Sequence, residues 1–237
     1  MPEPVTNEIM IITGAGKGIG RALAEYFVNK GMLVFGCSRS GSDLLAENYK
    51  HFSINVSDEK NVQEMVSTVA KQYGKIDYLL NNAGIASMNH SLLTPGSTVE
   101  KIFDVNVLGT FLFSRETAKV MSKNKFGRII NFTTVGVPLQ LEGECIYSSS
   151  KSAVETMTKI MAKEFAALNI TVNAIGPNPV RTDLIKNVPD EKINALLNRQ
   201  AIKELSGFED IINVVEFFIN RRSRMITGQT IYLGGVS

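Results

Sequence analysis

Short apolar runs alternate with longer amphipathic segments along most of this chain. The apolar runs are typical of buried strands, and they lie at 8–13, 32–37, 51–55, 76–81, 127–133, 170–175 and 229–233. Between them, apolar residues recur at helical spacing, which predicts helices at 18–30, 59–73, 98–123, 147–168 and 209–220. Strands that alternate with helices indicate βαβ units, a parallel sheet and right-handed crossovers. The pattern therefore predicts an α/β fold of three layers, with a doubly wound, seven-stranded parallel sheet between two layers of helices.

The stretch 176–206 is the least regular part of the chain. It contains Pro177, Pro179 and Pro189, and its pattern then predicts a helix at 190–204. Ligands of an open parallel sheet bind at the carboxyl ends of the strands, and a loop after the sixth strand lies there. We therefore expect 183–206 to form a mobile lid over a substrate.

Composition limits the class of protein. The chain has 237 residues, of which 44% are hydrophobic and 20% charged, and no repeat or linker divides it, so we expect one domain over 1–237. A net charge of +2 gives no reason to expect nucleic acid as a partner. No apolar run approaches ~20 residues, and the first residues lack a signal-peptide pattern, so no membrane contact is expected. Cys37 and Cys145 have no metal-ligand spacing. We expect no metal site, and a reducing cytoplasm as the location.

A glycine-rich run, Thr13-Gly-Ala-Gly-Lys-Gly-Ile-Gly20, lies between the first predicted strand and the first predicted helix. Glycines allow the backbone to approach a bulky anion closely, and a helix N-terminus carries a partial positive charge. A tight turn without a ligand is the alternative. The strand-loop-helix context favours a nucleotide phosphate site, formed by Gly14, Gly16, Lys17, Gly18, Ile19 and Gly20.

Further motifs follow in a characteristic order. The glycine spacing is G-x-x-x-G-x-G, and the later motifs are Asn81-Asn-Ala-Gly84, Asn106, Tyr147-Ser-Ser-Ser-Lys151, Asn173-Ala-Ile-Gly-Pro177 and Thr227-Gly-Gln-Thr-Ile231. Together they resemble the short, single-domain branch of the short-chain dehydrogenase/reductase family, over nearly the whole chain. The resemblance implies a Rossmann-type sheet, a nicotinamide cofactor, and oxidoreduction between a carbonyl compound and a secondary alcohol.

Tyr147 and Lys151 are the candidate catalytic pair. Residues four apart share one face of a helix, and a nearby ammonium lowers the tyrosine pKa from its usual value of ~10. Tyr147 would then exchange a proton with the substrate oxygen while hydride is transferred to or from carbon. A second pair at the same spacing, Tyr26 and Lys30, ends the first predicted helix and needs no catalytic role.

The resemblance gives roles to three further groups. Lys151 would also hold the nicotinamide ribose, and Asn106 would anchor a water in a proton relay; the alternative for Asn106 is a buried amide that bends its helix. Thr134 stands where the family usually has serine, and its hydroxyl keeps the ability to hydrogen-bond a substrate oxygen. Thr133 is the alternative bearer of that role. A threonine here could also signal a non-catalytic, NADP(H)-binding sensor.

The cofactor choice rests on the end of the second strand. Ser38 and Arg39 occupy the place where an NAD enzyme commonly has an acid, and arginine binds a phosphate with two charge-assisted hydrogen bonds. With Lys17 nearby, we expect NADP(H). The resemblance places further residues at the cofactor, namely Asn55, Val56, Asn82, Ala83, Gly84, Tyr147, Lys151, Pro177, Val180 and Thr182. Asn178 replaces a usual glycine, and asparagine tolerates the positive φ such a turn needs.

The substrate is less constrained. The 3-oxoacyl-[acyl-carrier-protein] reductases of the family are the nearest type, and Lys125 fits one place where they present a basic residue to the carrier; the other place holds Leu168. A sugar, a polyol or a small ketone remains open as substrate. Five apolar residues could wall a substrate pocket or belong to the core: Met88, Leu139, Leu141, Ile146 and Leu184. The resemblance also implies a homodimer or homotetramer through the helices at 98–123 and 147–168.

Overall fold

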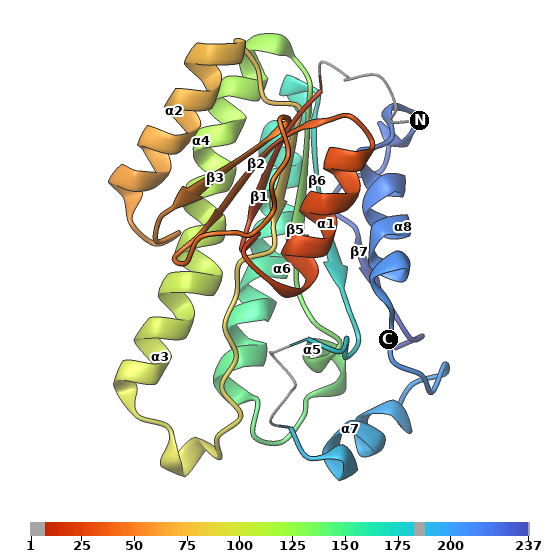
Figure 1. Ribbon diagram of the computed structural model, residues 1–237. Helices are drawn as coiled ribbons and strands as arrows, with labels where there is room; N and C mark the ends of the chain where they lie inside the picture. The colour runs from red at the N-terminus through yellow and green to blue at the C-terminus, as the bar shows by residue number, and fades with distance from the viewer. Residues whose placement is uncertain (1–7, 183–187, 237) are drawn as a thin grey trace.

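The molecule is organised around a seven-stranded sheet, shown by a computed structural model that describes residues 8–182 and 188–236 (Figure 1). All neighbouring strands are parallel, and their order is β3-β2-β1-β4-β5-β6-β7. The strands are β1 (Ile9–Thr13), β2 (Leu33–Ser38), β3 (Tyr49–Ser53), β4 (Tyr78–Asn81), β5 (Gly127–Phe132), β6 (Ile170–Gly176) and β7 (Thr230–Tyr232). The predicted doubly wound α/β class is confirmed.

Helices cover both faces of the sheet. One face carries α1 (Gly18–Asn29) and α8 (Phe208–Ile219), and the other carries α2 (Glu59–Tyr73), α4 (Gly109–Asn124) and α6 (Cys145–Phe165) (Figure 1). Strand β1 is buried along its whole length. Its Ile9 and Ile11 join the core beneath α2, α4 and α6, while Met10 and Ile12 join the core beneath α1 and α8. Burial on both faces explains why the strands are continuous apolar runs.

The remaining short elements connect these layers. They are α3 (Gly96–Phe103), the π-helical η2 (Asp104–Leu108), α5 (Gly136–Leu139), α7 (Asp190–Leu197), and the 3₁₀ turns η1 (Ser91–Leu93), η3 (Ala166–Leu168) and η4 (Arg221–Ser223). In Figure 1, α5 and α7 lie beyond the sheet, at the end where β6 stops. No helix within the described residues combines the length and apolarity that a bilayer span needs.

Three predicted elements differ from those in the structure. The third strand begins at Tyr49, because pairing starts where Tyr49 lies opposite Val34. The helix predicted at 98–123 is interrupted by η2, since one widened turn does not disturb the apolar pattern enough to be seen. The helix predicted at 190–204 ends at Leu197, and the backbone that follows bonds to the C-terminal segment instead, through Ala201 and Ile202.

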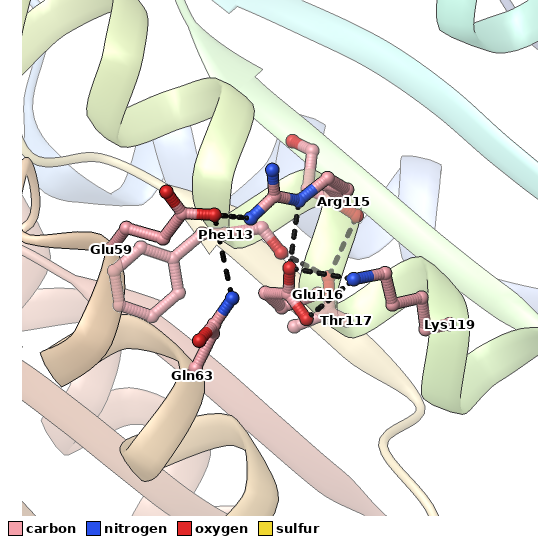
Figure 2. Close-up of polar contacts among 8 residues, drawn as sticks. Glu59, Gln63, Phe113, Arg115, Glu116, Thr117 and Lys119 are labelled. Carbon is pink, nitrogen blue, oxygen red and sulfur yellow. Dashed lines mark hydrogen bonds and ion pairs between the residues drawn. The ribbon is translucent and has the colours of Figure 1, made fainter.

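A network of charged side chains lies on the surface of α2 and α4 (Figure 2). Arg115 on α4 donates to Glu59 on α2 at 2.5 Å and to Glu116 at 2.7 Å, and Lys119 donates to Glu116 at 2.9 Å. Partial burial raises the pKa of Glu116, but Lys119 and Arg115 outweigh it and hold that pKa below its usual value. Exposed pairs of this kind contribute about 0–1 kcal/mol each. The fully buried Phe113 on the inner face of α4 therefore matters more for holding the layer.

The strand order creates a crevice at one edge of the sheet. The chain runs outward from β1 through β2 to β3, then returns to place β4 on the other side of β1. The loops after β1 and β4 therefore leave in opposite directions, and a crevice forms between them at the carboxyl ends of the strands. The predicted site residues converge at this edge.

Candidate functional site

A cleft of about 1350 Å³ opens at the carboxyl edge of the sheet. A site for one small ligand typically has ~300–1,000 Å³, so this cleft has room for a dinucleotide and a substrate together. The predicted site residues that line it are Gly14, Gly16, Lys17, Gly18, Ile19, Ser38, Arg39, Asn55, Val56, Asn82, Ala83, Gly84, Thr134, Tyr147, Lys151, Pro177, Val180 and Thr182. Gly20 and Asn106 are not part of the lining.

The loop after β1 is fixed tightly against the loop after β4. Gly14 has a φ of +69°, and a methyl group on it would lie 2.8 Å from both the Cα of Ala83 and the Nδ2 of Asn82. Asn82 donates to the carbonyl of Thr13 at 3.0 Å, and the amide of Ala83 donates to the Thr13 hydroxyl at 2.9 Å. A methyl group on Gly20 would lie 2.3 Å from the carbonyl oxygen of Gly14. Gly20 therefore allows close packing behind the loop.

The first turn of α1 faces the cleft. The helix begins at Gly18, and its N-cap residue Lys17 makes no side-chain capping hydrogen bond. The first amides of a helix have no partner within the helix and attract anions. Gly18 faces Thr182, whose methyl carbon lies 3.5 Å from where a Gly18 side chain would begin. Between them, these residues form a glycine-lined cradle that fits a pyrophosphate.

The other end of the cradle holds Ser38 and Arg39. The Ser38 hydroxyl donates to the carbonyl of Ser40 and lies 2.9 Å from Nε2 of His51, whose Nδ1 lies 2.7 Å from the Tyr49 hydroxyl. Burial lowers the pKa of His51, although its contact with the Ser40 carbonyl opposes the shift. No sequence pattern indicated a role for His51, yet its side chain contacts the Ser38 hydroxyl and helps to position it. Arg39 is exposed beside it on the cleft wall.

Tyr147 projects from the first turns of α6 onto the cleft wall. Burial raises its pKa to about 12, the nearby Glu144 adds to the rise, and a hydrogen bond with the Thr134 side chain opposes it. The prediction that Lys151 lowers the pKa of Tyr147 is therefore wrong for this structure, because desolvation outweighs any such effect. The phenol remains protonated at neutral pH, which suits a proton donor.

Lys151 lies one helical turn beyond Tyr147 and is buried. Its ammonium donates to the carbonyl of Phe132, at the end of β5, at 2.7 Å. A methyl group on Gly84 would lie only 3.2 Å from the Lys151 nitrogen. Burial lowers the pKa of Lys151 to about 8. The Lys151 ammonium therefore lies between the end of β5 and the loop that follows β4.

Asn106 lies behind the cleft and is completely buried. The π-helical turn η2 directs its side chain toward the loop after β4. The amide oxygen accepts from the backbone N–H of Ile85 at 2.9 Å, and the amide nitrogen donates to the Ile85 carbonyl and the Ser150 hydroxyl, both at 3.0 Å. Both the oxygen and the nitrogen of the Asn106 amide therefore have hydrogen-bond partners within the protein. This environment matches the alternative interpretation, a buried amide within its helix, rather than a water-anchoring role.

The two neighbouring threonines at the end of β5 differ in their partners. The Thr133 hydroxyl donates to the buried carboxylate of Glu155 at 2.6 Å, which also accepts from the Tyr232 hydroxyl at 2.6 Å. The Thr134 hydroxyl instead accepts from the backbone N–H of Gly136 at 3.1 Å, and the Thr134 side chain is near enough to Tyr147 to lower the pKa of that phenol. Both threonines line the cleft, but the Thr133 hydroxyl is already bonded to Glu155, whereas Thr134 lies beside Tyr147.

The substrate side of the cleft matches the predicted wall only in part. Met88 and Leu141 line the cleft, whereas Leu139 and Ile146 do not. Leu184 and the other residues at 183–187, which begin the predicted lid 183–206, lie outside the described residues. The described remainder of that segment contributes lining residues that the sequence did not suggest, namely Val188, Lys192, Ile193, Ala195, Leu196 and Arg199.

Asn178 differs from its predicted behaviour. Within the described chain, the non-glycine residues with positive φ are Lys125, Gln140 and Asn169, so Asn178 does not adopt that conformation. Its buried amide instead donates to Gln200 at 3.1 Å and to the carbonyl of Glu204 at 2.8 Å. The asparagine thus ties the loop after β6 to the chain beyond α7.

Glu144 is the lining residue that sequence reasoning missed most clearly. It precedes Tyr147 by three residues at the start of α6, and its side chain is buried on the cleft wall. The spacing from Tyr147 could have indicated Glu144 as a site residue, because residues three apart lie on one face of a helix.

The fold and the cleft define a nucleotide-binding protein of the doubly wound α/β class, with a tyrosine and a lysine beside the binding site. Comparison with known proteins makes the class narrower. The family model described as short chain dehydrogenase matches residues 8–193. The chain belongs to this family and is an oxidoreductase of it.

Individual relatives agree with this assignment. The 3-oxoacyl-[acyl-carrier-protein] reductase FabG of Vibrio harveyi is 32% identical over 235 residues, which cover 97% of this chain and 96% of that protein. The structure of 4-hydroxyisoleucine dehydrogenase complexed with NADH has a TM-score of 0.86 at 29% identity and covers 96% of this chain and 97% of the other. The structure of ElxO with NADP bound has a TM-score of 0.87 at 27% identity, with the same coverage.

Proposed function

We propose that this protein is an NADP(H)-dependent oxidoreductase that transfers a hydride between the nicotinamide and a carbonyl compound or its secondary alcohol. The observation that carries the proposal is the position of the Tyr147 phenol on the cleft wall beside the Thr134 side chain. The phenol lies one helical turn from the buried ammonium of Lys151. Nucleotide binding alone does not require these three groups together.

In this account a bound nicotinamide supplies or takes up the hydride, and the protein manages the proton. Tyr147 donates its phenolic proton to the substrate oxygen as the carbonyl carbon becomes that of an alcohol, and takes a proton back in the reverse direction. The Thr134 hydroxyl orients the same oxygen. Lys151 holds the ribose hydroxyls by hydrogen bonds. Asn106 acts as a positioning residue that fixes the loop after β4, and its predicted part in a water relay stays a prediction.

The preference for NADP(H) rests on charge. Arg39 and Lys17 both line the cleft, and Ser38 stands where a carboxylate would repel a 2′-phosphate. Solved relatives include one described with NADH and one with NADP, so the family alone does not decide the cofactor. Arg39 is the residue from which we infer the choice.

The structure of one chain does not favour a carrier-bound substrate. Lys125 follows α4 and precedes β5, at the edge of the sheet opposite the cleft. Within a single subunit it therefore lies away from the site, although relatives such as the Vibrio harveyi reductase are named for a carrier-linked substrate. We infer a free carbonyl compound or alcohol as the substrate.

We also propose a homodimer or homotetramer formed through α4 and α6. Large apolar side chains remain exposed here: Leu108, the last residue of η2 before α4, at 40%, Phe111 on α4 at 39%, and Ile160 on α6 at 51%. Arg115 of the network in Figure 2 lies 5.5 Å from the ring of Phe111. Sedimentation of the purified protein as a species heavier than one chain would support this. The free thiols of Cys37 and Cys145 are compatible with a reducing, cytoplasmic location.

The direct test is NADPH consumption against a panel of ketones, aldehydes, sugars and 3-oxoacyl thioesters. We expect turnover with at least one carbonyl class, and loss of that turnover in Tyr147→Phe. Binding of NADPH without turnover of any compound would contradict the proposal and favour an NADP(H)-binding sensor.

A further inference from the structure

A buried carboxylate that the proposed proton transfer does not use lies next to Tyr147. Glu144 is the N-cap residue of α6 and only 7% of it is exposed. A methyl group on Gly136 would lie 2.4 Å from its Oε2 atom. The carboxylate therefore occupies space that α5 leaves open only because it begins with glycine. This arrangement builds the acid into the wall between α5 and α6.

Over the part of the chain that the structure describes, one oxygen of the carboxylate has a donor from the protein and the other does not. Among the described residues, its one side-chain hydrogen bond comes from the Ser148 hydroxyl, which reaches Oε2 at 3.3 Å. No donor from the described chain reaches Oε1. Among the described residues, the buried polar atoms that lack a partner do not include Oε1, so this oxygen reaches the open cleft. Burial of the carboxylate group raises the pKa of Glu144. A carboxylate oxygen that lies on the wall of a binding cleft without a donor from the protein can accept a hydrogen bond from a ligand.

The position of Glu144 fixes where that donor would lie. Glu144 and Tyr147 are three residues apart on α6, a spacing that puts the two side chains on one face of the helix, and both line the cleft. The two groups also interact electrostatically. If Tyr147 contacts the reacting oxygen, Glu144 faces a neighbouring carbon of the same substrate.

We propose that Glu144 is a specificity residue whose free carboxylate oxygen accepts a hydrogen bond from the substrate. The inference rests on the proposed function, and it names the substrate class: carbonyl compounds, or their alcohols, that carry a hydroxyl or ammonium group beside the reacting carbon. Both groups share the required chemistry, an O–H or N–H donor, and the test separates them. A simple ketone would offer no donor to the Glu144 oxygen.

The test compares substrates that differ in one donor. The probes are 1-hydroxy-2-butanone, its methyl ether 1-methoxy-2-butanone and 1-amino-2-butanone, with NADPH. The ether keeps the electronic effect of the oxygen but has no proton to donate. A hydrogen bond to a charged group contributes about 1.5–3 kcal/mol, so we expect the wild type to prefer the hydroxyketone over the ether about 10-fold to 100-fold in kcat/KM.

Variants assign that preference to the carboxylate. Glu144→Gln should reduce the hydroxyketone-to-ether ratio about tenfold, while Glu144→Asp, which keeps the charge, should retain more of it. Glu164→Gln is the matched control, because Glu164 is an exposed acid on the same helix that does not line the cleft; it should leave the ratio unchanged. Melting temperatures show whether each variant is folded. If Glu144→Gln does not fold, the Glu144→Asp ratio and the wild-type ratio carry the test.

The outcomes are separable. A preference for the amine over the hydroxyketone, lost in Glu144→Gln, supports the proposal with an ammonium as the donor. Turnover of these ketones with a wild-type ratio within twofold of one overturns the inference alone. A ratio that survives Glu144→Gln also overturns it, and leaves Glu144 as a group that only holds the phenol of Tyr147 protonated. Failure of every carbonyl compound to react overturns the proposed function and this inference with it.

Discussion

The two ends of the cleft differ in which parts of the residues form them, backbone at one end and side chains at the other. At the nucleotide end, the contacts are between backbones: Gly14 approaches Ala83 so closely that no side chain fits between them. At the substrate end, side chains define the site, with Thr134 and Glu144 set around Tyr147. A ligand common to a whole family can be held by main-chain geometry that tolerates few substitutions. A ligand particular to one member requires side chains, which can change without rebuilding the fold.

Lys151 lies where the two ends meet, and removing it should have a large effect. In Lys151→Met, we expect kcat/KM for carbonyl reduction to fall roughly 10²–10³-fold, because an ammonium near the proton donor and the ribose is lost. Steady-state kinetics with NADPH measure this. Retained activity would remove Lys151 from the catalytic group.

The same variant makes a prediction for stability. The folded-state pKa of Lys151, about 8, lies below the ordinary value of 10.5. The unfolded chain therefore binds more protons between these values, and the wild type gains stability as pH rises through this window. The shift corresponds to about 3 kcal/mol. The melting temperature of Lys151→Met relative to wild type should therefore be highest near neutral pH and decline between about pH 8 and pH 10.5. A difference that does not vary with pH would contradict the buried, charged lysine.

The pH profile of the reaction follows from the same two groups. Tyr147, with a pKa of about 12, remains a proton donor across the neutral range, whereas Lys151 loses its charge above about pH 8. Carbonyl reduction should therefore be constant from about pH 6 to pH 7.5 and decline as pH rises through 8. A rate that increases through pH 8 would contradict this order of the two pKa values.

Gly14→Ala tests the backbone character of the nucleotide end. The new methyl group would lie 2.8 Å from Ala83, at a φ of +69° that side chains rarely adopt. Strain and displacement of about 3 kcal/mol predict a loss of roughly 100-fold in NADPH affinity, measurable by calorimetry. Gly41→Ala is the matched control, since a methyl group there would have no neighbour within 4 Å. Equal affinities of the two variants would contradict the account.

Arg39→Ala should change the choice of cofactor. Loss of charge-assisted hydrogen bonds worth about 1.5–3 kcal/mol predicts a 10-fold to 100-fold fall in NADPH affinity relative to NADH. Arg222→Ala, which removes an exposed arginine outside the cleft lining, should leave the ratio unchanged. If wild type binds both cofactors equally and Arg39→Ala does not change this, the assignment of NADP(H) fails.

The smallest expected effect distinguishes the two threonines. Thr134→Ala should lower kcat about tenfold with little change in melting temperature, and Thr134→Ser should restore most of it. Thr133→Ala should act mainly on stability, because its hydroxyl partner Glu155 is buried. The reverse pattern would move the catalytic hydroxyl to Thr133.

Most residues that line the nucleotide end of the cleft could be predicted from the sequence. A glycine such as Gly14 indicates a position where the backbone conformation or a close approach excludes other residues. Buried parallel strands produce apolar runs that are easy to recognise. The side-chain-built end was less visible. The burial of Glu144 depends on the glycine of α5 opposite it, and the pKa of Tyr147 depends on desolvation, neither of which local pattern records. Asn106 was found, but the π-helical turn that buries its amide was not, because one widened turn leaves the helical periodicity nearly intact.

The central claim is that the phenol of Tyr147 supplies the proton while the rest of the cleft binds the cofactor. The most direct test measures NADPH affinity and single-turnover carbonyl reduction on the same sample of Tyr147→Phe. We predict an affinity within about threefold of wild type and a reduction rate lower by roughly 10²–10⁴. A reduction rate close to that of wild type would contradict the claim.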